Sequence, residues 1–316
     1  MHKHKDLKTF YAIPEFRANK KTVLTLGTFD GVHLGHQSIL KKLKKAGEEL
    51  HCESLVLTFF PHPRMVLQQD SDIKLLNTIA EKSLLLERFG VDNLIIHPFD
   101  ATFSQLSAEA FVSEVLVKQF NIAKIIIGYD HRFGKNRSAT IDDLIVFGKK
   151  YSFEVEQISA QEIDEVSVSS TKIRTALDNG DVETASAYLG YPYFFSGKVV
   201  KGKQLGRTIG YPTANIEIPE EYKLIPKIGV YVVSSEINGK TVFGMMNIGY
   251  NPTVKGTNKT IEVHFFDFKA DIYDTEVTVS LHQRLRDEQK FGSVELLQEQ
   301  LSRDKVASLE YISKHF

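Results

Sequence analysis

The chain has 316 residues, of which 42% are hydrophobic and 25% charged, a composition typical of a globular protein long enough for two domains. A formal net charge of -1 argues against general nucleic-acid binding, and a single cysteine, Cys52, excludes an internal disulfide and a thiolate metal site. The basic start of the chain is not followed by an apolar segment, and no apolar run approaches the roughly 20 residues of a membrane span, so we expect a cytoplasmic protein.

The first half of the chain alternates short apolar strands with amphipathic helices. We expect strands at Val23–Leu26, Ser54–Phe59, Asn93–His97, Lys124–Gly128 and Val155–Ile158. Helical spacing is found between them at Gln37–Glu49, Thr78–Phe89, Ala108–Phe120 and Ile141–Lys150. This alternation predicts an α/β domain with a parallel sheet covered on both faces, in which ligands bind beyond the carboxyl ends of the strands.

The pattern changes near residue 190. Ser170 can cap a helix that ends at Asn179-Gly180, and a short helix over Asp181–Leu189 follows before a connector. The next part is rich in strands, which we expect at Tyr193–Val200, Gly229–Glu236, Thr241–Ile248, Lys259–Phe266 and Glu276–Leu281. Asn238-Gly239 is a strong hairpin signal, so a compact antiparallel sheet or barrel follows, with a terminal helix over Ser293–Lys314.

The segment Gly27–His36, with the sequence GTFDGVHLGH, lies where the first predicted strand turns into the first predicted helix. A helix N-terminus beside glycines offers free backbone N–H groups and a partial positive charge, so it suits an anion. His33 and His36 are three residues apart and can add donors toward one phosphate chain. The alternative is a pair of ordinary surface histidines on a turn.

A second candidate phosphate site is Ser169-Ser170-Thr171 with Arg174, at the start of a predicted helix. The hydroxyl groups are donors, and the planar guanidinium group of the arginine can donate two parallel hydrogen bonds to phosphate oxygens. A capped helix with a surface arginine is the alternative. Together with the histidine turn, the segment would hold phosphates from two sides, which suits nucleotidyl transfer.

Two further segments follow predicted strands. Thr58–Arg64 combines aromatic residues, stiff prolines and a histidine, so it can either wall a planar ligand or cap the core. Gly128–Lys135 contains two glycines that allow close approach of the backbone to a ligand.

In the β-rich half, Gly197–Gly210 is a glycine-spaced basic segment in which Lys203 and Arg207 can wrap a polyphosphate. The Thr213 hydroxyl and the Asn215 carbonyl are hard ligands suited to Mg²⁺ shared with phosphates. The segment is not a Walker loop, and a β-hairpin with a basic rim is the alternative.

Glu262 lies on a predicted strand in which Ile261 and Val263 face one side, and Glu262, His264 and Phe266 the other. A carboxylate at the mouth of a barrel could deprotonate a hydroxyl nucleophile. An exposed glutamate on a strand is the alternative, and spacing alone favours it.

Taken in order, these motifs resemble those of the bacterial bifunctional riboflavin kinase/FMN adenylyltransferases, or FAD synthetases, over nearly the whole chain. The resemblance implies a Rossmann-like nucleotidyltransferase domain over residues 1–188. It implies a riboflavin kinase domain over residues 189–316, with a six-stranded antiparallel β-barrel and a terminal helix. The implied reactions are the ATP-dependent phosphorylation of riboflavin to FMN and the adenylylation of FMN to FAD with release of pyrophosphate, both with Mg²⁺.

In the first domain the resemblance implies that His33 and His36 contact the ATP phosphates and that the segment containing Arg174 closes over them. The other residues implied to bind ATP are Gly27, Phe29, Asp30, Gly31, Ser169, Ser170 and Thr171. Those on the flavin side are Phe60, His62, Pro63, Asp130 and Phe133.

In the second domain Pro212–Asn215 resembles the PTAN motif, whose Thr213 and Asn215 would hold Mg²⁺-ATP, and Glu262 would be the general base for the ribityl 5′-hydroxyl. Asn247–Gly249 and Asn251–Thr253 also match the family. The remaining implied residues are Gly202, Lys203, Gly206 and Gly210 for ATP, and Arg286 and Phe291 for the flavin.

Two residues depart from the family pattern: His131 stands where phenylalanine is common, and Ser138 where glycine is usual. They put details of the flavin side in doubt. Two rival functions remain, a nucleotidyltransferase for another acceptor and a flavin-binding or RNA-binding regulator with decayed sites. The first leaves the PTAN segment unexplained, and the second conflicts with the presence of all the implied catalytic residues. We expect flavins and ATP as partners, and neither nucleic acid nor membrane.

Overall fold

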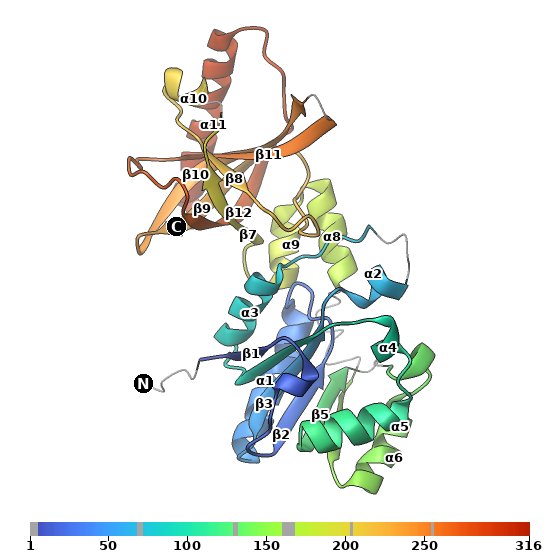
Figure 1. Ribbon diagram of the computed structural model, residues 1–316. Helices are drawn as coiled ribbons and strands as arrows, with labels where there is room; N and C mark the ends of the chain where they lie inside the picture. The colour runs from blue at the N-terminus through green and yellow to red at the C-terminus, as the bar shows by residue number, and fades with distance from the viewer. Residues whose placement is uncertain (1–5, 68–71, 129–131, 160–167, 203–204, 254–255) are drawn as a thin grey trace. The chain divides into compact units, whose positions relative to one another are not determined.

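The computed structural model describes residues 6–67, 72–128, 132–159, 168–202, 205–253 and 256–316 (Figure 1). The chain divides into two compact units, Met1–Ser169 and Ser170–Phe316. None of the helices in these described ranges is long and apolar enough to cross a membrane.

The first unit is built on a six-stranded sheet whose paired strands all run parallel. In spatial order the strands are β1 (Lys8–Phe10), β4 (Asn93–His97), β3 (Glu53–Phe59), β2 (Thr22–Leu26), β5 (Ile122–Gly128) and β6 (Glu154–Ile158). The central strands are apolar on both faces because helices cover both, as the sequence pattern predicts. The predicted strands are confirmed, while the short edge strand β1 was not predicted.

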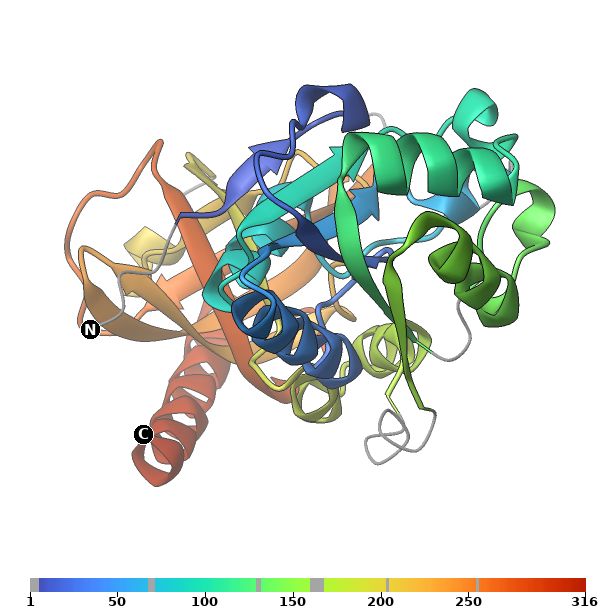
Figure 2. The ribbon, with the colours of Figure 1, turned by 90° about the horizontal axis from the view of Figure 1, so that it is seen from below.

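The helices of this unit are α1 (Leu34–Glu49), α2 (Pro63–Leu67), α3 (Ile79–Arg88), α4 (Ala101–Ser104), α5 (Ala108–Ala110) and α6 (Ile141–Tyr151), with short 3₁₀ turns at η1 (Ile13–Glu15) and η3 (Lys135–Arg137). After α5 the chain continues as a π-helix, η2 (Phe111–Gln119). Figure 2 shows α1 on one face of the sheet and η2 with α6 on the other. The core on the η2 side joins Leu24, Leu55 and Ile125 of the sheet to Phe111 and Leu116 of η2.

The second unit begins with a helical pair, α8 (Ser170–Asn179) and α9 (Val182–Leu189), which pack against each other. A closed antiparallel barrel follows, formed by β7 (Phe194–Val200), β8 (Ala214–Glu217), β9 (Gly229–Ile237), β10 (Lys240–Thr253), β11 (Gly256–Phe265) and β12 (Glu276–Arg286). Their order around the barrel is β10-β11-β8-β7-β12-β9. The short helix α10 (Leu205–Thr208) lies between β7 and β8, and the terminal helix α11 (Val294–His315) packs on β9, β10 and β12.

The predicted antiparallel barrel and terminal helix are therefore confirmed, and the sixth strand, which the residue pattern alone did not indicate, is β8. The compact units divide between Ser169 and Ser170, so α8 and α9 belong to the second unit by packing. The domain boundary that we place at residue 188 stays a prediction.

Candidate active sites

The segment between β2 and α1 is a buried turn with an unusual backbone. Phe29, Gly31 and Val32 have positive φ angles of 45°, 85° and 37°, and the side chains of Phe29 and Val32 are buried. A left-handed backbone at an aromatic or β-branched residue costs on the order of 1–3 kcal/mol, so it persists only where surrounding contacts hold it. The turn is thus held by its environment rather than by local preference.

Two side chains hold the carbonyl oxygen of Thr28. The Lys82 ammonium on α3 donates a hydrogen bond to it at 2.7 Å, and the Thr58 hydroxyl at the end of β3 donates another at 3.2 Å. Thr58 and Lys82 are both buried. One backbone oxygen of the turn is therefore fixed from the neighbouring strand and from a helix that follows it.

The rest of the turn is held in the same way. The Leu76 backbone N–H donates to the Asp30 carboxylate at 2.9 Å, and the Gln37 side-chain amide donates to the Val32 carbonyl at 2.9 Å. Asp30 is only 2% exposed, which makes it a structural support of the turn rather than a group at its surface. Phe29 is also buried, so a contribution of Phe29 or Asp30 to ATP binding would come through the backbone.

The two histidines lie at the start of α1, with His33 flanking its first turn and His36 within it. Their rings stack with centroids 3.7 Å apart, and the Phe29 ring lies 5.0 Å from that of His36. Burial lowers the pKa of His33 to about 4, and burial with the neighbouring His33 and Lys82 lowers the pKa of His36 well below its ordinary value. Both imidazoles are therefore neutral at pH 7, and each offers one N–H donor and no charge.

Both rings also have a buried Nδ1 atom with no hydrogen-bond partner in the described part of the chain. Buried polar atoms without a partner are uncommon and cost free energy, so they mark places shaped by something other than stability. The unpartnered Nδ1 atoms favour a functional role for the histidine pair. The burial of His33, which is only 7% exposed, also argues against the alternative of surface histidines on a turn.

The segment after β3 lies at the same edge of the sheet as the histidine turn, because β3 and β2 are parallel neighbours. Phe60 and His62 are half-buried, and Pro63 begins α2. The His62 Nδ1 atom accepts a hydrogen bond from the Arg64 backbone N–H at 3.1 Å. The structure thus brings this predicted flavin-side segment to the edge that carries the turn.

The segment after β5 is only partly described, since Asp130 and the unusual His131 lie outside the described residues. Phe133 is buried in the core cluster, with its ring 6.0 Å from that of Phe111. Its placement favours a packing role, and its assignment to the flavin side stays a prediction. Ser138, the other departure from the family pattern, is exposed after the short turn η3.

The predicted segment Ser169–Arg174 spans the division between the units, with α8 starting at Ser170. On α8, Ile173 is buried, Arg174 is half-buried and Thr171 is exposed. The helix therefore buries one side and presents polar groups on another, a pattern that fits both a phosphate-binding helix start and a capped surface helix. The joint action of this segment with the histidine turn stays a prediction.

In the second unit the PTAN segment leads into β8, where Asn215 is directly opposite Glu262 on β11. Glu262 is in turn opposite Asn247 on β10. Residues directly opposite one another in antiparallel strands share a face, so these three side chains form one row across three strands. The Thr213 hydroxyl donates to the Glu262 carboxylate at 3.2 Å. The structure thus assembles three of the predicted kinase residues at one place.

The loop before β8 is fixed by His264, two residues beyond Glu262 on β11. Its Nδ1 atom donates to the Pro212 carbonyl at 2.8 Å, and its ring lies 5.2 Å from that of Tyr211. Burial lowers the pKa of His264, and the hydrogen bond to Pro212 acts in the opposite direction. Sequence reasoning placed His264 on the face of Glu262 but gave it no role.

Gly202 leaves room for the side chain of Asn215. A Cβ atom on Gly202 would come within 2.2 Å of the Asn215 side-chain nitrogen, so a larger residue there would displace that amide. Gly210 has a φ of 84°, which also favours glycine. Gly206 packs against Tyr211, and Lys203 lies outside the described residues.

A cavity of about 270 Å³ lies beside the PTAN segment, lined in part by Arg207, Pro212, Thr213, Val263 and residues 268–273. It puts a basic side chain and an apolar wall next to the Thr213 hydroxyl. The oxygen donors of Thr213, Asn215 and Glu262 fit Mg²⁺, which prefers hard oxygen ligands and usually shares them with substrate phosphates.

The two predicted flavin residues of the kinase domain lie together. The Arg286 guanidinium is 5.9 Å from the centre of the Phe291 ring. It also binds both carboxylate oxygens of Asp304 on α11, at 2.9 Å from Nε and 2.7 Å from Nη2. Asp304 is 4% exposed and accepts a further bond from Gln300. The terminal helix is thus tied to the end of β12 by an ion pair with a buried carboxylate, which sequence reasoning missed.

We expect Asp304→Asn to destabilise the second unit by about 2–3 kcal/mol, because the half-buried Arg286 guanidinium would lose its ionised, buried partner. Differential scanning calorimetry of the whole chain would show one transition moving to lower temperature. Glu299→Gln is the control, because Glu299 pairs with Arg303 on the exposed side of the same helix and should shift unfolding by less than about 1 kcal/mol. Equal shifts for both variants would contradict the role given to Asp304.

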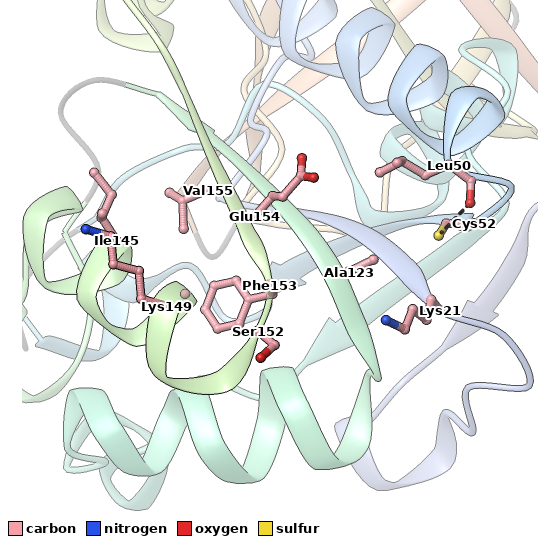
Figure 3. A pocket seen from close by; sticks show the side chains of 11 residues that line it. Lys21, Leu50, Cys52, Ala123, Ile145, Lys149, Ser152, Phe153, Glu154 and Val155 are labelled. Carbon is pink, nitrogen blue, oxygen red and sulfur yellow. Dashed lines mark hydrogen bonds between the residues drawn. The ribbon is translucent and has the colours of Figure 1, made fainter.

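Another cavity, of about 660 Å³, is lined by none of these residues (Figure 3). It is lined by Lys21, Cys52, Ala123 and Glu154, which precede or begin strands, and by Lys149 of α6. These positions are at the amino edge of the parallel sheet, whereas ligands of such sheets bind at the carboxyl edge. Its volume therefore does not identify an active site.

Comparison with known proteins assigns each part of the chain to a family. Residues 15–172 match the family model of FAD synthetase, and residues 189–312 match that of riboflavin kinase. The chain is 40% identical over 294 residues to the bifunctional riboflavin kinase/FMN adenylyltransferase of Listeria monocytogenes, covering 92% of this chain and 93% of that protein. It is 38% identical over 301 residues to the protein of the same name from Bacillus subtilis, covering 93% of each.

Among solved structures, a crystal structure described as a macrolide-efflux protein from Streptococcus pneumoniae is similar, with a TM-score of 0.87 and 33% identity. The alignment covers 96% of this chain and 98% of that one. The two matched domains make this chain a transferase with a nucleotidyltransferase and a kinase part. It belongs to the bifunctional riboflavin kinase/FMN adenylyltransferase family, and it converts riboflavin to FMN and FMN to FAD.

Proposed function

We propose that the two reactions take place at two separate sites. Riboflavin is phosphorylated beside Thr213, Asn215 and Glu262, and FMN is adenylylated at the histidine turn. The observation that carries the first assignment is the hydrogen bond from Thr213 to Glu262, with Asn215 directly opposite on β8. The stacked and neutral histidines at the carboxyl edge of the sheet support the second.

In the kinase site, Glu262 accepts the proton of the ribityl 5′-hydroxyl while that oxygen attacks the γ-phosphorus of ATP. The bond from the γ-phosphorus to its bridging oxygen breaks, and ADP leaves. The Thr213 hydroxyl holds one carboxylate oxygen at 3.2 Å, which orients the other for the substrate. Gly202, Gly206 and Gly210 line the path of the ATP phosphates, and Arg286 with Phe291 borders the flavin. Lys203, which lies outside the described residues, is a further proposed ligand of those phosphates.

In the adenylyltransferase site, a phosphate oxygen of FMN attacks the α-phosphorus of ATP, and pyrophosphate leaves. His33 and His36 donate neutral N–H groups to phosphate oxygens, while Arg174 adds a charged fork. Gly27, Gly31 and the backbone of Phe29 and Asp30 shape the turn, and the role proposed for Ser169, Ser170 and Thr171 is to bind ATP. Phe60, His62, Pro63 and Asp130 border the flavin, with Phe133 supporting them from the core.

Mg²⁺ would be held by the oxygen atoms of Thr213 and Asn215 in the kinase site, where it neutralises phosphate charge when bound. We further propose that the enzyme works in the cytoplasm, where its single cysteine stays reduced, and that its partners are flavins and ATP rather than nucleic acid or membrane.

Incubation with riboflavin, ATP and Mg²⁺, followed by chromatographic separation of the flavins, tests this proposal. We expect FMN first and FAD second, FAD alone from supplied FMN, and neither product when EDTA removes the metal. A protein that binds flavin without turnover would be a regulator and would contradict the proposal. Unchanged turnover in EDTA would contradict the metal requirement.

A further inference from the structure

Lys82 is a buried cation next to the histidine turn, and none of the motifs accounts for it. It lies in the first turns of α3, whose start is fixed by a capping box between Thr78 and Glu81. Its side chain is 4% exposed, and its ammonium donates to the Thr28 carbonyl at 2.7 Å. A buried lysine is costly unless its charge is used or compensated, so its presence here calls for a reason.

The electrostatic surroundings of Lys82 come from the turn itself. Burial lowers its pKa to about 8, while the Asp30 carboxylate acts in the opposite direction. Lys82 also lies close enough to His36 to lower the pKa of that ring, as His33 does. At pH 7 the turn therefore combines two neutral imidazoles with one buried ammonium group. The positive charge next to the histidine pair comes from α3 and not from the histidines.

We propose that Lys82 is a positioning residue for FMN adenylylation: its ammonium group locks the strained turn through Thr28 and supplies the positive charge beside His36. Three groups depend on it. Thr28 keeps its carbonyl fixed, Asp30 keeps a nearby countercharge, and His36, which burial already keeps neutral, has a positive charge beside it that lowers its pKa further. The inference rests on the proposed location of adenylyl transfer at this turn.

Three substitutions separate the two parts of this role. Lys82→Met keeps the aliphatic stem and removes both the donor and the charge. Lys82→Gln keeps a donor for Thr28 without the charge, and Lys82→Arg keeps the charge at every accessible pH. Lys118→Met is the matched control, because Lys118 is an exposed lysine of the same unit, paired with Glu114.

We expect Lys82→Met to lower kcat/KM for FMN adenylylation by about 10- to 100-fold, the range for a lost hydrogen bond to a charged group. The kcat/KM of Lys82→Gln should lie between that of Lys82→Met and that of the wild type. Riboflavin phosphorylation by the same molecules should stay at the wild-type rate, since its site is in the other unit. Lys118→Met should leave both rates unchanged.

The pH profile distinguishes this role from a merely structural one. In the wild type, kcat/KM for adenylylation should fall above a pH of about 8 as the ammonium of Lys82 loses its proton. The Lys82→Arg variant should lack this alkaline fall. In Lys82→Met, kcat/KM should be low and should not change with pH in the same range. A second readout is the pKa of His36, followed by NMR of histidine-labelled protein, which should rise in Lys82→Met because a nearby positive charge is gone.

The inference is wrong if Lys82→Met adenylylates FMN normally while His36→Ala does not, or if the His36 pKa and the alkaline fall are the same in all Lys82 variants. If His36→Ala itself retains full activity, the failure lies in the proposed location of adenylyl transfer and overturns the role of Lys82 with it.

Discussion

Glu262→Gln is expected to stop the phosphorylation of riboflavin and to spare the formation of FAD from supplied FMN. Loss of a general base typically lowers a rate by about 10²–10⁴-fold. The substitution keeps the shape of the side chain and an oxygen that can accept the hydrogen bond from Thr213, so the barrel should fold normally. The two rates are measured separately, one with riboflavin and ATP and the other with FMN and ATP.

Glu276→Gln is the control for this experiment. Glu276 is an exposed carboxylate at the start of β12, in the same barrel, and its removal should change neither rate. If Glu262→Gln phosphorylates riboflavin as fast as the wild type, Glu262 is not the base. If both reactions fail together while calorimetry shows a folded chain, the two reactions do not have separate sites.

His36→Ala is expected to give the converse pattern, with FMN accumulating from riboflavin and little FAD formed. Removing one preorganised donor to a developing phosphate charge costs on the order of 10²–10³-fold in rate, by analogy with oxyanion donors. Alanine is a strong helix former, so α1 should keep its start at Leu34. Chromatography of the flavins over time, with riboflavin as the starting material, measures both steps in one reaction.

His51→Asn is the matched control, because His51 is an exposed histidine of the same unit. Its φ of 52° is a conformation that asparagine tolerates, so the substitution should not strain the backbone. Normal FAD formation by His36→Ala would show that the histidine turn is not the adenylylation site. A matching loss in His51→Asn would point to general destabilisation of the first unit instead.

Much of the fold could be predicted from the sequence, because the strands of the first unit are apolar runs separated by helical spacing and the barrel strands are β-rich segments separated by turn signals. Strands β2 to β6 and the barrel strands other than β8 carry that signal, and the structure confirms them. Strand β8 has only four residues, Ala214–Glu217, and the sequence pattern did not single it out as a strand. It becomes a strand because β7 and β11 pair with it on both sides. Strand β1 has three residues and pairs with β4.

The functional residues also differ in how far the sequence indicated them. Spacing and glycines singled out the histidine turn and the PTAN segment, whereas Lys82 looked like an ordinary residue of an amphipathic helix. Asp304 gave no signal either, because it lies 18 residues beyond Arg286 on another element. Residues that meet only through tertiary contacts have no fixed spacing in the sequence, so sequence motifs do not identify them.

By itself, then, the sequence determined the order of strands and helices and the residue types available at the ends of the strands, since both follow from local patterns of polarity and backbone preference. The charge state of those residues was decided only by the tertiary structure. Burial makes His33 and His36 neutral. The positive charge beside them comes from Lys82, which α3 brings to the turn. Desolvation depends on what packs around a group, and that is a property of the folded chain.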